Sequence, residues 1–262
     1  MDSTTAQLDP LRRPPIRGRH YKYYDLVMVG FVAVILCSNL IGPGKTCLID
    51  VKLPIIPSLS GGFHWSSVLI FGAGNIFFPI SYIFDDVITE VYGYARSRKV
   101  IWAAFGAMAF ATVMSWVVIH LPLDPQEPFN KLMQPALETC FGNTWRITAG
   151  SLLAFWLGDF VNSYVLAKMK IWTRGRMLWT RTIGSTILGE GVDCLVFYPV
   201  AFLGIWSADT MISVVVFNWL FKVMVEVVMT PATYAVCGWL KRAESEDFYD
   251  RDTNFTPFSL RD

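Results

Sequence analysis

The chain has 262 residues, of which 53% are hydrophobic and 16% are charged, with a mean hydropathy of +0.42 and a formal net charge of +1. Soluble domains carry about 25% charged residues, so this composition argues against an ordinary soluble domain and favours an integral membrane protein. The chain also lacks the long basic run that is typical of nucleic-acid-binding proteins, so we expect no nucleic-acid partner.

In chain order, residues 1–20 come first; they are polar and contain three prolines, so we expect a disordered cytoplasmic tail. Six stretches of about 20 mostly apolar residues follow, each long enough to cross a membrane as a helix. They lie near 25–43, 67–88, 100–120, 147–167, 183–205 and 212–239. We therefore predict an all-α integral membrane protein with one six-helix transmembrane domain over 21–242. A second disordered cytoplasmic tail is expected over 243–262.

The loops between these spans predict an orientation. Most lysines and arginines outside the spans fall in the two tails and in the loops after the second and fourth spans. The opposite side holds only Lys45, Lys52, Lys131 and Arg146. The positive-inside rule then places both termini in the cytoplasm. Three spans precede the long 121–146 loop and three follow it, so a 3+3 inverted repeat is one arrangement that stays open.

The loops on the outer side carry two further features. The 44–65 loop is rich in proline and glycine and is expected to hold a short extended or hairpin element. Cys47 and Cys140 both fall on this side, where an oxidising compartment would let them pair. Nothing in the sequence brings the two together, so a disulfide is left open.

Charged side chains occur inside, or at the ends of, the apolar spans. They are Asp86, Glu90, Asp159, Glu190, Asp193, Lys222 and Glu226. A charge within a membrane helix costs roughly 2.5–3.5 kcal/mol on insertion scales, so its default interpretation is a functional site facing the bundle interior. Three pairs are spaced i,i+3 or i,i+4, which places both members of each pair on one helix face.

Structural roles compete with this interpretation. Glu90, at the end of the second span, could meet the cytoplasmic Arg96, Arg98 and Lys99. Asp159, with Asn162 three residues later, could hold two helices together through a hydrogen bond. Lys222 and Glu226 could form an ion pair within their own helix.

Other residues of these spans have structural interpretations, although Gly189 and Gly191 could also loosen the helix around Glu190 and expose backbone groups to a ligand. We interpret Asp85 as solvated or structural, and we expect Pro79 to bend the second span. Small residues such as Ser185, Gly189 and Gly191 would allow a close helix approach.

The surplus of acids carries the functional argument. Six carboxylates against one lysine cannot all be ionised and unpaired in a low-dielectric interior, so some must be protonated, solvated or paired with a ligand. Such a site favours a ligand rich in N–H donors, or a cation, and coupling to a proton is one hypothesis. The chain has no H-E-x-x-H motif, and we predict neither a metal nor a cofactor.

Three motifs resemble the queuosine precursor transporters, small six-helix inner-membrane proteins of bacteria sometimes labelled vitamin-uptake-like. They are FP-x6-D-x3-E-x-Y-G at Phe78–Gly93, ST-x6-D-x3-F at Ser185–Phe197, and FK at Phe221–Lys222 followed by Pro231. The resemblance covers about 22–242. It implies a multi-pass inner-membrane transporter, not an enzyme, that imports 7-cyano-7-deazaguanine or its aminomethyl form. A coupling proton or cation and a homodimer remain open.

This ligand fits the acidic residues, because one carboxylate can accept both adjacent donors of a guanine-like edge. We favour Asp193 and Asp86 for this role, with Glu90, Glu190 and Glu226 behind them. Lys222 or Asn39 could donate to the ring carbonyl. Aromatic side chains could stack on the ring, the candidates being Trp156, Phe197 and Tyr198.

Two other functions stay open. One is a substrate-binding subunit of an ATP-driven vitamin importer, because such subunits are also small and six-helical and this chain has no P-loop. The other is a Mg²⁺-dependent prenyltransferase-like membrane enzyme, because DDVITE at 85–90 and EGVD at 190–193 are similar to diphosphate-binding acidic motifs.

Overall fold

The structure is a computed structural model that describes residues 21–41, 46–50, 68–142 and 145–259. The predicted tail 1–20 and most of the 44–65 loop lie outside these residues. The elements in chain order are α1 (Tyr24–Leu40), β1 (Thr46–Asp50), β2 (Val68–Gly72), the 3₁₀ helix η1 (Ala73–Phe77), α2 (Phe78–Val87), the π-helical turn η2 (Ile88–Tyr92), α3 (Tyr94–His120), α4 (Asn130–Phe141), α5 (Trp145–Trp172), α6 (Leu178–Phe202) and α7 (Ala208–Glu244).

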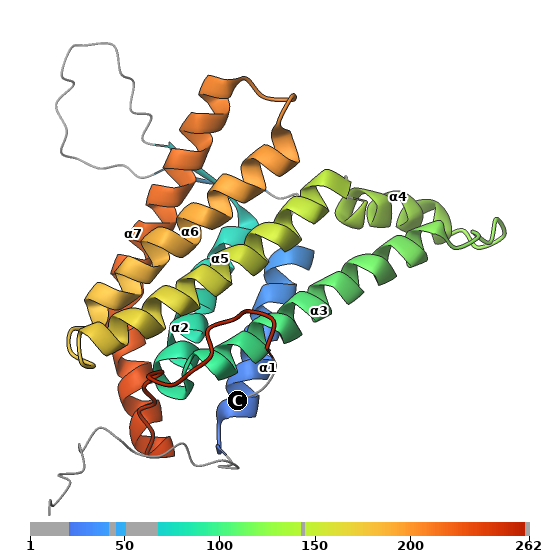
Figure 1. Ribbon diagram of the computed structural model, residues 1–262. Coiled ribbons are helices and arrows are strands. Elements are labelled where there is room, and N and C mark those ends of the chain that lie inside the picture. Colours follow the sequence, from blue (N-terminus) through green and yellow to red (C-terminus); the bar gives the residue numbers. More distant parts are fainter. Residues whose placement is uncertain (1–20, 42–45, 51–67, 143–144, 260–262) are drawn as a thin grey trace, which may run out of the picture.

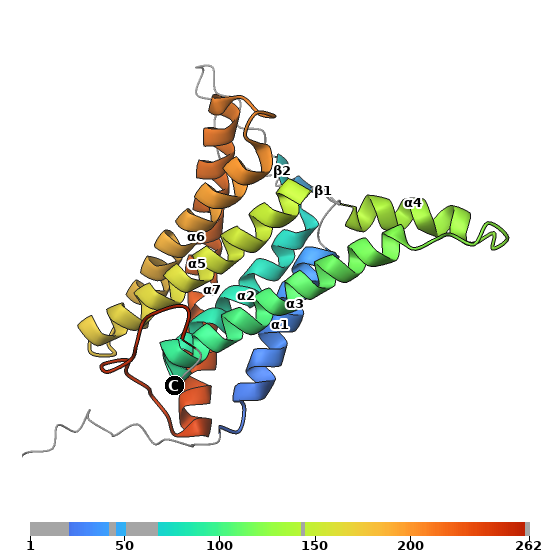
Figure 2. The ribbon, with the colours of Figure 1, turned by 45° about the vertical axis from the view of Figure 1, so that its right-hand side comes forward.

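The described chain is predominantly helical, as predicted, and helical structure occurs in each of the six predicted apolar segments. Three of these helices, α3, α6 and α7, are individually long and apolar enough to cross a membrane. Figures 1 and 2 show α5, α6 and α7 side by side, with α1, α2 and α3 completing the bundle. In both views α4 projects to one side from the end of α3.

The second predicted span differs from expectation at its start. Residues 68–72 form β2, which pairs antiparallel with β1 from Thr46↔Gly72 to Asp50↔Val68. Pro79 lies in the first turn of α2, where its missing N–H would have no helical partner in any case. The proline therefore starts α2 and does not bend the middle of a long helix.

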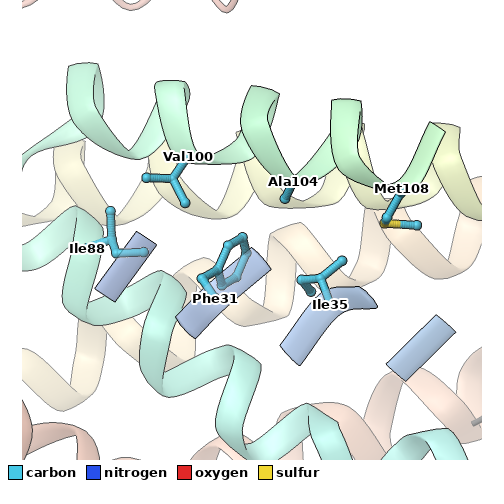
Figure 3. Close-up of a cluster of buried hydrophobic side chains, with 6 residues drawn as sticks. All are labelled: Phe31, Ile35, Ile88, Val100, Ala104 and Met108. Carbon is cyan, nitrogen blue, oxygen red and sulfur yellow. The ribbon is translucent and has the colours of Figure 1, made fainter. Parts of the chain in front are cut away.

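A core of apolar side chains joins α1, η2 and α3 (Figure 3). Phe31 and Ile35 of α1 face Val100, Ala104 and Met108 of α3, and Ile88 completes the cluster. Gly93 lies between η2 and α3. Its φ is +87°, a conformation that glycine adopts readily.

Helices α5 and α6 approach each other closely through glycines. A Cβ at Gly189 would lie 2.7 Å from the Cβ of Asn162 and 2.9 Å from the carbonyl oxygen of Gly158. This is the role predicted for Gly189, and it fixes the side chains of α5 and α6 that face the bundle interior.

The two ends of the helical domain lie on the same side of the bundle. The backbone N–H groups of Lys22 and Tyr23 donate to the Glu244 carboxylate at 3.0 and 2.7 Å. The Tyr21 hydroxyl donates to Glu246 at 3.1 Å. The start of α1 is thereby joined to the end of α7.

Residues 245–259, which we call the C-terminal strap, run along the ends of α3 and α5 (Figure 1). Asp250 accepts the Tyr94 backbone N–H at 3.1 Å, and Trp102 Nε1 donates to the Pro257 carbonyl at 2.8 Å. Phe255 packs against the ring of Tyr94. This ordered path differs from the disorder expected for 243–262. Donor groups on α3 bind acceptors of the strap, including a backbone carbonyl, and a polar sequence does not show which of its carbonyl groups will be bound.

Candidate functional site

A cavity of about 530 Å³ lies between the helices. Most of the predicted site residues line it, namely Asn39, Asp159, Asn162, Glu190, Asp193 and Lys222. The other three, Asp86, Glu90 and Glu226, are not among its lining residues. The structure thus divides the predicted set into a cavity group and a group buried elsewhere.

Lys222 lies between two acids of the neighbouring helix. Its Nζ is 2.6 Å from Glu190 Oε2 and 2.5 Å from Asp193 Oδ2, and it also lies 5.0 Å from the centroid of the Phe78 ring. The predicted alternative of an ion pair with Glu226 in the same helix does not form. The three groups carry a net negative charge when all are ionised.

Helix α5 contributes Asp159 and Asn162 to the same cavity. Asn162 Nδ2 donates to Asp85 Oδ2 at 2.5 Å, and the Ser163 hydroxyl donates to Asp85 Oδ1 at 3.2 Å. Asp159 Oδ2 is buried and has no hydrogen-bond partner in the described part of the chain. An acceptor without a donor at the cavity wall is suited to a ligand that supplies one.

Asp85 is the main residue that the sequence interpretation missed. It is 6% exposed and lines the cavity, so of the two alternatives given for it, solvated or structural, the solvated one is wrong. The sequence offers one indication of a role for Asp85, its position next to Asp86. The i,i+4 spacing to Glu90 favours Asp86 over Asp85.

Asn39 lies on the α1 side of the cavity. Its Oδ1 accepts a hydrogen bond from Ser151 of α5 at 3.1 Å, and its Nδ2 donates to the Ile35 carbonyl at 2.9 Å. Aromatic lining residues include Phe78, Phe155, Phe197 and Tyr198. The third predicted stacking residue, Trp156, packs instead against Trp102 and Phe160.

Glu90 belongs to a separate ionic cluster near the C-terminal strap. Arg181 donates to both Glu90 oxygens at 2.8 and 2.6 Å, and Lys241 Nζ lies 2.5 Å from Oε1. Lys170 Nζ donates to the Glu90 backbone carbonyl at 2.5 Å. These partners replace the arginines and lysine of 96–99 that we had considered, and they join η2 to α5, α6 and α7.

The strap closes this cluster with Asp247, whose carboxylate lies 2.6 Å from Lys170 Nζ and 2.8 Å from Lys241 Nζ. Partial burial acts to raise the pKa of Asp247, but the adjacent Lys170 and Lys241 outweigh it and hold that pKa below its ordinary value. The strap therefore stays bound through this carboxylate at neutral pH.

Asp86 and Glu226 form a third group. They are 1% and 0% exposed, and the two carboxyls interact with each other between α2 and α7.

Of the residues left open for a disulfide, Cys140 is a free thiol.

Comparison with known proteins gives one family. Its model, described as "Putative vitamin uptake transporter", matches residues 72–236, which include every acidic residue of the cavity but neither Asn39 nor the strap. No solved structure matches the chain.

Two named relatives agree with this family. A "Probable queuosine precursor transporter" of Bacillus subtilis (strain 168) is 35% identical over 164 residues, covering 62% of this chain and 69% of the relative. A "Queuosine precursor transporter" of Escherichia coli (strain K12) is 24% identical over 167 residues, covering 62% and 71%. The family and both relatives are described as transporters and not as enzymes, which favours a transporter over the prenyltransferase-like alternative.

Proposed function

The chain belongs to the vitamin uptake transporter family, and we propose that it imports a 7-deazaguanine precursor of queuosine across the bacterial inner membrane. The names of the two relatives support this substrate class. The acidic, aromatic-lined cavity supports it independently.

In the proposed arrangement the chain crosses the membrane six times, through α1, the η1–α2–η2 segment, α3, α5, α6 and α7. The joined ends of α1 and α7 would lie in the cytoplasm, in keeping with an even number of crossings. The cluster of Arg181, Lys170 and Lys241 lies near these ends, as the positive-inside rule expects.

The observation that carries the proposal is the buried, unpartnered carboxylate oxygen of Asp159 in a cavity that also holds Lys222. The guanine-like edge of a 7-deazaguanine presents a ring N–H next to an amino group, and one carboxylate can accept both. We therefore give Asp159 the acceptor role that the sequence had favoured for Asp193 and Asp86. Asp193 is already bonded to Lys222, and Asp86 does not line the cavity.

The remaining cavity groups fit the rest of the ligand. Lys222 can donate to the ring carbonyl while it stays bound to Glu190 and Asp193. Phe197 and Tyr198 offer faces on which a flat ring can stack, which contributes roughly 1–3 kcal/mol for a base. The acidic lining also suits the positive charge of the aminomethyl form.

Measurement of tRNA modification in cells tests the proposal. We would express the chain in a bacterial strain that lacks both precursor synthesis and its own precursor transporter, supply 7-cyano-7-deazaguanine or the aminomethyl form at low concentration, and measure queuosine in tRNA. The proposal expects queuosine to appear with this chain and not with the empty vector. Unmodified tRNA despite normal membrane expression would reject it.

A further inference from the structure

The Asp86–Glu226 pair is the most completely buried acidic pair among the described residues, and the cavity does not account for it. Asp86 is 1% exposed and Glu226 is 0% exposed, and neither lines the cavity. All four carboxylate oxygens lack a hydrogen-bond donor in the described part of the chain. Asn162 lies beside Asp86, and Thr182 lies beside Glu226, without completing a hydrogen bond.

The charged groups that face the pair make its ionisation harder. From α2 the neighbour is Asp85, from α6 it is Glu190, and both are acids. From α7 the neighbour of Asp86 is the buried thiol of Cys237. No cation among the described residues pairs with either carboxyl, because Lys222 is bonded to Glu190 and Asp193, and the Glu90 cluster holds the basic groups nearer the strap.

Two adjacent carboxylates in a low-dielectric site both carry a charge only at a high cost in free energy when no counter-ion is present, so the doubly charged form readily takes up a proton. One proton shared between them lowers this cost, since a carboxylic acid O–H then donates to the neighbouring carboxylate. The pair therefore has the composition of a one-proton binding site.

We propose that the Asp86–Glu226 pair binds the proton that drives substrate import. This inference rests on the proposed function, because it names the ion that would be coupled to that transport. The proton enters from the outer side and converts the charged pair to its singly protonated form. It leaves to the cytoplasm after the substrate, and the pair returns to its deprotonated form with no other bond made or broken.

Asn162 connects the pair to the substrate cavity. It lines the cavity, donates to Asp85 at 2.5 Å and lies beside Asp86. A substrate that engages the neighbouring Asp159 can shift the position of Asn162 on the same helix face. Substrate occupancy and protonation of the pair are thereby linked through one side chain.

Proteoliposomes containing the purified full chain test the coupling. With one proton carried per uncharged substrate, an inward proton gradient of one pH unit without a membrane potential supports about tenfold accumulation of labelled 7-cyano-7-deazaguanine. Glu226→Gln and Asp86→Asn should reduce this ratio to about one while retaining exchange of labelled for unlabelled substrate. Asp209→Asn, which changes an exposed acid at the start of α7, should behave as the wild type.

A second readout does not depend on transport. The infrared spectrum of the purified protein at neutral pH should contain a band from a protonated carboxyl group that either pair variant removes and Asp209→Asn keeps. Absence of that difference band would overturn the proton site. Accumulation driven by a sodium gradient, or transport unaffected by the proton gradient, would overturn the coupling while the proposed function stands. A difference band without any precursor transport would instead reject the proposed function and leave the proton site in place.

Discussion

Single residues of the cavity differ in what their neighbours leave available. Lys222 is committed to two carboxylates, whereas Asp159 keeps a buried oxygen without a donor. A buried acceptor that lacks its donor costs about 1–3 kcal/mol, and a ligand that supplies the donor recovers this free energy on binding. We therefore expect substrate recognition to depend on Asp159.

Asp159→Asn should weaken precursor binding. The amide keeps the size of the side chain but replaces one acceptor oxygen with a donor and removes the charge, and hydrogen bonds to charged groups contribute about 1.5–3 kcal/mol. We expect the Kd for labelled precursor to rise roughly 10- to 100-fold by equilibrium binding to purified protein. Asp209→Asn serves as the control, and an unchanged Kd in Asp159→Asn would remove Asp159 from the site.

Glu90→Gln should act on stability and leave recognition intact. The substitution leaves the cationic groups of Arg181, Lys170 and Lys241 with only Asp247 to balance them. Breaking a buried ion pair by removing one partner costs about 3–5 kcal/mol, so the midpoint of thermal unfolding in detergent should fall. The folded fraction should keep the wild-type Kd. A stable Glu90→Gln protein that binds precursor more weakly would return Glu90 to the substrate site.

The sequence pointed to Asp159, Glu190 and Asp193 of the cavity but missed Asp85, and it could not assign the partners of these acids. Helical spacing places Glu190 and Asp193 on one face of α6, yet it cannot show that Lys222 of α7 reaches both of them. Asp85 and Asp86 differ by one residue, which turns their side chains toward different neighbours. Only the packing of α5 and α7 against α2 decides which of the two lines the cavity.

At the scale of elements, close contact between α5 and α6 determines the shape of the cavity. The six apolar segments could be predicted because their length and hydropathy follow from the width of a membrane. The β1–β2 pairing and the position of Pro79 in the first turn of α2 could not be, since an apolar run such as 68–72 suits a strand as well as a helix. The order of the strap was not predicted, because Arg98 and Trp102 hold it through its backbone carbonyl groups. Such contacts do not depend on side-chain composition, so the polar sequence gives no sign of them.

Gly189→Ala should disturb this contact. The new methyl group would lie within 3 Å of the Asn162 Cβ and the Gly158 carbonyl oxygen, and neither can move without shifting the backbone of α5. Overpacking of this kind costs about 1–3 kcal/mol, so we expect a lower unfolding midpoint together with weaker precursor binding.

Gly106→Ala is the matched control, because a Cβ at that position of α3 meets nothing within 4 Å. Alanine favours a helix over glycine by about 1 kcal/mol, so its unfolding midpoint should be unchanged or higher. Equal effects of the two substitutions would contradict the close α5–α6 packing.

At the scale of the whole molecule, the arrangement predicts which ends are accessible from outside the cell. Helix α4, which carries the exposed Cys140, projects to the side from the end of α3 that lies away from the strap (Figure 2). In intact cells expressing a Cys47→Ser variant, a membrane-impermeant maleimide should label Cys140, and Cys140→Ser should abolish the signal. Asp252→Cys in the strap, combined with Cys140→Ser, should react only after the membrane is opened. Labelling of the strap in intact cells would reverse the proposed orientation.

We propose that this chain moves a queuosine precursor across a membrane without a partner protein. This proposal is tested most directly by uptake of labelled 7-cyano-7-deazaguanine and its aminomethyl form into liposomes that contain only the purified protein, without ATP. The Escherichia coli relative serves as a parallel sample, and protein-free liposomes give the background. We expect saturable uptake above background that Asp159→Asn strongly reduces. If this chain gave only background uptake under conditions in which the relative transports the precursor, transport by this chain alone would be contradicted. If uptake required added ATP-driven subunits, the importer-subunit alternative would be favoured.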